Sequence, residues 1–126
     1  MKRLLFILTC CLSLSVASPA YAEQDSKPVQ TALSQLMQAI SDNDYDAFTS
    51  SGTPLFRKNV TKQSFESVRN QLGELIRAGY SVEYVSELYQ KGNIVHVWKI
   101  SYAKSKENSL AKLILIEDKV AGFWLF

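Results

Sequence analysis

A chain of 126 residues, 47% of them hydrophobic, is long enough to form one domain with its own core. Its formal net charge is only +2 at pH 7, from 14 basic and 12 acidic residues. Proteins that bind nucleic acid carry a basic excess or a basic stripe, and this chain has neither. We therefore expect no nucleic-acid partner.

The first segment has the three-part layout of a secretory signal peptide. Two basic residues open the chain, an apolar run covers 4–16, and small residues at Ala20 and Ala22 form a cleavage site. The apolar run is too short for a transmembrane helix, which needs about 20 apolar residues. We expect residues 1–22 to be a signal peptide cut near Ala22. The mature chain would then have no membrane anchor and would reside in the periplasm or outside the cell.

Cleavage would change the composition of the mature protein. Cys10 and Cys11 are the only cysteines, so the exported domain would have to be stable through its core, without a disulfide. Lys2 and Arg3 account for the whole basic excess, so the mature chain would be formally neutral. Residues 23–27 are polar and are expected to be a flexible leader.

A single α+β domain is expected over residues 28–126, beginning with three helices. Pro28 suits the first turn of a helix, and the apolar residues behind it recur every three or four positions. Asp44 is expected to cap a second, short helix, and Thr61 a third and longest one over 62–78. Between these two helices, Leu55-Phe56 is expected to pack as a single turn.

From Tyr80 onward the apolar pattern changes to a period of two, which is typical of strands. Short turns separate four segments, so an antiparallel meander is expected, with strands over 80–89, 94–102, 110–117 and 120–126. Helices followed by strands indicate the α+β class. The sequence therefore predicts three N-terminal helices packed on a curved four-stranded antiparallel sheet.

This order of elements resembles a known family. The step Asp42-Asn43-Asp44-Tyr45 into the second helix and the final Lys119–Trp124 strand resemble small exported members of the nuclear transport factor two-like superfamily, which includes ketosteroid isomerase. The resemblance implies a cystatin-like, half-open cone in which a bent sheet wraps the helices. Its members include isomerases, dehydratases and binding modules, so the resemblance gives no specific function and transfers no catalytic residue.

His96 is the only histidine and the one candidate for acid–base chemistry. It shares a strand face with Trp98 and Tyr102, so it would project into the interior of the cone. The alternative is a histidine at the edge of the core with one hydrogen bond. In a regular strand, Glu83 and Glu87 would fall on the face opposite Tyr84, and no carboxylate base of the ketosteroid isomerase type would be assembled.

Metal ions and cofactors are not expected. One histidine, no mature cysteine and scattered acidic residues do not supply three or four converging ligands. Asp42, Asp44 and Asp46 alternate, but the glycine and the closing glutamate of a calcium loop are missing. The chain also lacks a phosphate-binding loop and a dinucleotide fingerprint.

Two adjacent aromatic residues in the last strand, Phe123 and Trp124, must point to opposite faces of a regular sheet. One of them therefore lies outside the helix-facing core. An aromatic side chain on an outer face is often interfacial, so homodimerisation through this face is one hypothesis. The other is a monomer with a lone exposed aromatic.

Three functions remain open, and we favour a non-catalytic one. The first is an exported module that binds a small apolar ligand inside the cone, among Tyr84, His96, Trp98 and Tyr102. The second is an assembly module that homodimerises and has a filled interior. The third is an isomerase or dehydratase that uses His96. A cavity of roughly 300 Å³ or more in the cone interior would favour a ligand, whereas a packed interior would favour the assembly module.

Overall fold

The computed structural model describes residues 26–126, so the expected signal peptide and most of the leader lie outside the described residues. Four helices precede four strands: α1 (Lys27–Ser41), α2 (Tyr45–Ser50), α3 (Pro54–Asn59), α4 (Lys62–Arg77), β1 (Tyr80–Gln90), β2 (Asn93–Tyr102), β3 (Asn108–Ile116) and β4 (Lys119–Leu125). The strands form one antiparallel sheet in the order β1-β2-β3-β4. The α+β class and the meander are thus confirmed.

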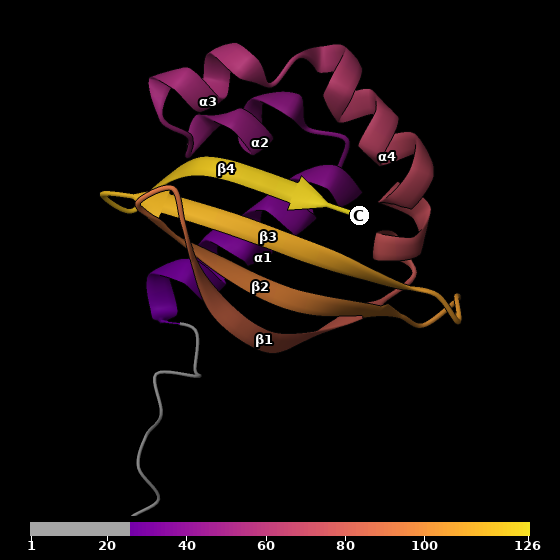
Figure 1. Ribbon diagram of the computed structural model, residues 1–126. Helices are drawn as coiled ribbons and strands as arrows, with labels where there is room; N and C mark the ends of the chain where they lie inside the picture. The colour runs from indigo at the N-terminus through magenta and orange to yellow at the C-terminus, as the bar shows by residue number, and fades with distance from the viewer. Residues whose placement is uncertain (1–25) are drawn as a thin grey trace, which may run out of the picture.

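The helices cover one face of this sheet. In Figure 1, α1 crosses behind the strands, while α2, α3 and α4 lie beyond the β4 edge and the end of the sheet. The opposite face, turned toward the viewer, carries no helix among the described residues. Within the same part of the chain, no helix is both long and apolar enough to cross a membrane.

The expected number of helices was wrong, because the segment at Leu55-Phe56 forms a complete short helix, α3. Thr53 caps this helix, and its hydroxyl accepts a hydrogen bond from the Phe56 backbone N–H at 3.2 Å. Pro54 occupies the first turn, where its fixed φ suits a helix and its missing N–H costs nothing. Pro54 therefore begins a helix instead of only breaking the chain.

The other expected helix starts are confirmed. The Asp44 carboxylate accepts a hydrogen bond from the Ala47 backbone N–H at 3.0 Å at the start of α2. Thr61 and Ser64 form a reciprocal capping box at the start of α4. Each cap satisfies backbone N–H groups that a helix end would otherwise leave without partners.

A continuous hydrophobic core fills the space between the helices and the sheet. Its members that are at most 1% exposed come from α1 and from three strands: Leu36, Met37, Ile40, Trp98, Ile100, Ala111, Leu113 and Val120. Trp98, Ile100 and Tyr102 face the helices together, as the alternation predicts. Val95 and Val97 are also buried, but they do not belong to this core cluster.

A β-bulge in β1 overturns one expectation about the strand faces. Tyr84 pairs with Trp98, but the next paired residue is Ser86, opposite Val97, so Val85 is an extra residue. The extra residue reverses the alternation beyond it. Glu87, expected on the face opposite Tyr84, instead pairs with His96 on the helix side. Before the bulge, Glu83 lies on the open face as expected, where its carboxylate is 3.2 Å from the ammonium of Lys99.

The burial of two paired tyrosines, Tyr80 and Tyr102, gives the fold a pH dependence. The Tyr102 hydroxyl donates to Ser109 Oγ at 2.8 Å. Burial raises the pKa of Tyr102 above its ordinary value of 10.0, while the hydrogen bond with Ser109 lowers it by less. Burial also raises the pKa of Tyr80, which pairs with Tyr102 in the sheet.

Stability should therefore fall in alkali. The folded state holds the tyrosine protons more tightly than the unfolded state, so this contribution is complete below pH 10 and is lost as the pH rises through the raised pKa values. We expect the free energy of unfolding, measured with urea, to begin decreasing near pH 10 and to decrease further as the pH rises above it. The decrease should be smaller in Tyr102→Phe. An equal decrease in that variant would assign the effect to other groups.

Candidate functional site

Three of the four residues predicted to contact a ligand are neighbours on the helix-facing side of the sheet. The ring of Trp98 meets that of Tyr84 edge to face, with centroids 5.9 Å apart, and lies 6.1 Å from the ring of His96. Tyr102 shares this face but lies four residues further along β2, a separation of about 13 Å in a strand. That these four residues contact a ligand stays a prediction.

His96 lies at the edge of the core, beside the carboxylate that the bulge brings to its side. Glu87 Oε1 is 3.9 Å from His96 Nδ1, which is longer than a hydrogen bond. Nδ1 is buried and has no hydrogen-bond partner among residues 26–126. The pair is a potential acid–base unit, but neither residue lines any of four cavities in the described part of the chain.

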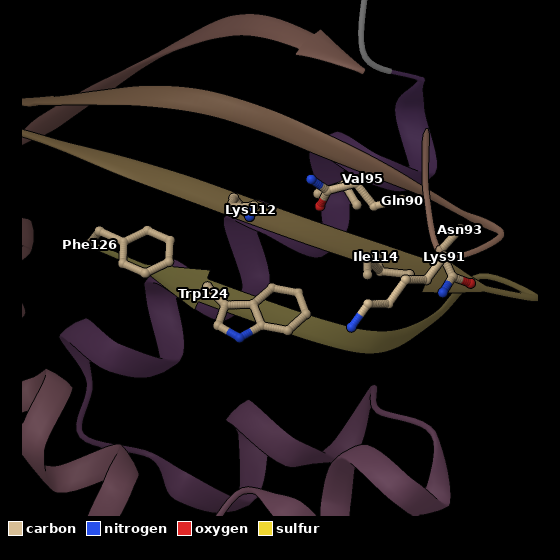
Figure 2. A pocket seen from close by; sticks show the side chains of 8 residues that line it. All are labelled: Gln90, Lys91, Asn93, Val95, Lys112, Ile114, Trp124 and Phe126. Carbon is tan, nitrogen blue, oxygen red and sulfur yellow. The ribbon is translucent and has the colours of Figure 1, made fainter. Parts of the chain in front are cut away.

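The largest of these four cavities lies on the open face of the sheet and has a volume of about 520 Å³. Figure 2 shows its side chains on the strands, with α1 behind the sheet. They come from all four strands, the β1–β2 turn and the residue after β4: Gln90, Lys91, Asn93, Val95, Lys112, Ile114, Trp124 and Phe126. We call this cavity the open-face hollow.

Trp124 forms one wall of the open-face hollow because a glycine leaves room for its ring. A β-carbon at Gly122, two residues earlier on the same face, would meet Trp124 Cζ3 at 2.7 Å. The indole thus lies against bare β4 backbone and stays 44% exposed. Phe123 points the other way and packs on Phe48, with ring centroids 6.0 Å apart. The expectation that one of the two adjacent aromatics lies outside the core is confirmed, and that residue is Trp124.

The opposite wall comes from the tight turn between β1 and β2. Lys91 and Gly92 both have positive φ, at 52° and 79°, as the favoured two-residue hairpin turn requires. This turn presents the Lys91 side chain at its tip. In Figure 2 that side chain extends from the turn toward the Trp124 indole.

The open-face hollow is positively charged. Lys91 and Lys112 line it, and no acidic residue does. The ammonium of Lys112 stands 6.0 Å from the centroid of the Phe126 ring, within the range of a cation–π contact. Two ion pairs are found among residues 26–126, His96–Glu87 and Lys99–Glu83, and neither involves these lysines.

The role of Gly122 can be tested by substitution. Gly122→Val should push the Trp124 indole off the strand, because a side chain at this position needs the space the ring occupies. We expect a longer-wavelength tryptophan emission, since Trp98 stays buried and only Trp124 changes its environment. Ala121→Val, a neighbouring change on β4, is the matched control and should leave the emission unchanged. An unshifted Gly122→Val spectrum would contradict this placement of the ring.

The sequence matches no protein-family model and no curated protein. Among solved structures, the chain is similar to the crystal structure of an NTF2-like protein of unknown function from Cytophaga hutchinsonii. The TM-score is 0.39 and the sequence identity 6%, over 82% of this chain and 91% of that chain. The likeness is one of fold arrangement alone.

Proposed function

We propose that this domain is a non-catalytic, exported binding module that holds a small, largely apolar ligand in the open-face hollow. One observation carries the proposal: a cavity of about 520 Å³ opens between an exposed tryptophan and a fixed turn, on the face that no described helix covers. This volume falls within the range of about 300–1,000 Å³ typical of small-molecule sites. The part of the proposal that concerns export rests on the N-terminal sequence pattern alone.

The packing of the other face supports this location. Trp98, Ile100 and Leu113 are fully buried against the helices, so a ligand there would have to displace core side chains. Displacing a close-packed core costs several kcal/mol, of the order of a large-to-small substitution. On the open face, by contrast, a cavity of about 520 Å³ is already present, so a ligand displaces no core side chain.

The composition of the open-face hollow supports binding over catalysis. Its side-chain polar groups are two lysine ammonium groups, the amides of Gln90 and Asn93 and the indole N–H of Trp124, and no histidine, acidic or hydroxyl residue lines it. Such a set can orient a ligand, but it lacks the paired acid and base of an isomerase or dehydratase. The His96–Glu87 pair lies on the opposite face of the sheet.

A homodimer through the same face is the competing function, and specific residues favour it. Exposed apolar side chains surround the open-face hollow on β1 and β3: Leu88, Leu110 and Ile116. A two-fold dimer, however, sets identical patches against each other. Here a concave surface would meet a second concave surface, and each copy would bring Lys91 and Lys112 to the contact. Neither shape nor charge is self-complementary, so we favour the ligand.

Titration with N-phenyl-1-naphthylamine, a neutral three-ring fluorophore, tests the proposal. We expect saturable binding of one probe per chain with a dissociation constant in the micromolar range, and native mass spectrometry should show a monomer that retains the probe. A dimer that binds no probe would overturn the proposal in favour of assembly. His96→Ala should change the affinity less than about twofold, because His96 lies across the sheet from the open-face hollow. Loss of binding in that variant would place the ligand on the inner face.

A further inference from the structure

The open-face hollow combines an apolar floor with two unpaired cations, and this combination narrows the class of ligand. Resting on the proposed function, we infer that the ligand is a single amphipathic anion, a molecule with an apolar body and a carboxylate, sulfonate or phosphate head. The apolar body would lie on the sheet. The head would lie between the turn and β3, where Lys91 and Lys112 line the open-face hollow from two elements.

The apolar body is accommodated by side chains that stand side by side on three neighbouring strands. Val95 on β2, Ile114 on β3 and Trp124 on β4 all line the open-face hollow. Val95 is 2% exposed and forms a floor, whereas the half-exposed indole stands as a wall. A rigid aromatic wall beside aliphatic side chains gives a ligand apolar contact at a low cost in side-chain entropy.

The anionic head is required by the charges. Lys91 and Lys112 approach the same cavity from different elements, and no acidic side chain lines it to neutralise them. Neither lysine takes part in the ion pairs of the described residues, so their charges are available to a ligand. The amides of Gln90 and Asn93 add donors suited to the same head. A cationic ligand would meet two like charges here.

The net charge of the described residues does not account for the positive charge of the open-face hollow. Residues 26–126 hold 12 basic and 10 acidic residues, a formal surplus of only +2, yet two lysines and no acidic residue line the open-face hollow. A positive site on a domain with so small a net charge selects anions by local geometry and not by long-range attraction, so moderate salt should weaken the preference without abolishing it.

Two probes with the same ring skeleton separate this inference from the proposed function. 8-Anilino-1-naphthalenesulfonate differs from N-phenyl-1-naphthylamine by one sulfonate group. We expect the wild-type protein to bind the sulfonate about tenfold more tightly than the neutral probe at low salt. Lys91→Gln and Lys112→Gln should each weaken sulfonate binding about threefold and leave the neutral probe within twofold, and the double variant should lose the preference.

The matched control is Lys104→Gln. It removes one positive charge from the β2–β3 connection, at an exposed position that does not line the open-face hollow, and should change neither affinity. Equal wild-type affinities for the two probes, or a preference that survives in the double variant, would overturn the amphipathic anion and leave a neutral-ligand site. Absence of binding for both probes would overturn the proposed function itself.

Discussion

Trp98→Ala is expected to lower the free energy of unfolding by about 3–5 kcal/mol, the cost of removing a large aromatic side chain from a packed core. Trp98 is 0% exposed and contacts the rings of Tyr84 and His96. A small domain is stable by only about 5–15 kcal/mol, so this single change brings the protein close to unfolding. Urea denaturation followed by circular dichroism measures the loss.

The second tryptophan is the matched control for this measurement. Trp124→Ala removes the same atoms from a side chain that is 44% exposed and outside the core cluster, so it should cost about 1 kcal/mol or less. If Trp98→Ala leaves too little folded protein to measure, Trp98→Phe should give a smaller loss in the same direction. Equal losses at the two positions would contradict the division of the sheet into a packed face and an open face.

Trp124→Ala should have a small effect on stability but a large effect on ligand binding. Removing the indole takes away one wall of the open-face hollow, and we expect the affinity for both naphthalene probes to fall about tenfold or more. The fluorescence of the probes reports binding, so the change in tryptophan content does not interfere.

Tyr89→Ala provides the comparison for binding. Tyr89 is an aromatic residue on β1 that is 81% exposed and does not line the open-face hollow, so its loss should leave both affinities within about twofold. Weakening of the same size in Tyr89→Ala and Trp124→Ala would mean that the probes bind any exposed aromatic surface. The proposed site would then be wrong.

Local sequence signals predict most of this fold correctly. The caps at Asp44 and Thr61 and the change of apolar period at Tyr80 depend on residues within one turn or one strand of each other. They therefore appear in the sequence without knowledge of the tertiary structure. The short helix at Pro54 was missed because six residues are too few to show an apolar period, although Thr53 and Pro54 are local signals of a helix start.

The candidate site was harder to predict, for two physical reasons. Alternation assigns strand faces only while the strand is regular, and the extra residue Val85 reverses the assignment for Glu87. The open-face hollow, in addition, requires the β1–β2 turn to stand opposite β4, and no local pattern encodes that approach. One signal was available in the sequence: Gly122 precedes Trp124 by two residues, on the same strand face, where it makes room for the ring.

The central claim is that a ligand binds the open face of the sheet and leaves the inner face undisturbed, and the chain's two tryptophans report on one face each. A ¹⁵N-correlated NMR spectrum of the protein resolves the two indole N–H signals, which Trp98→Phe and Trp124→Phe assign. On titration with 8-anilino-1-naphthalenesulfonate, the account predicts that the Trp124 signal shifts progressively to saturation while that of Trp98 stays in place. A shift of the Trp98 signal with Trp124 unmoved would put the ligand among the helices and contradict the claim.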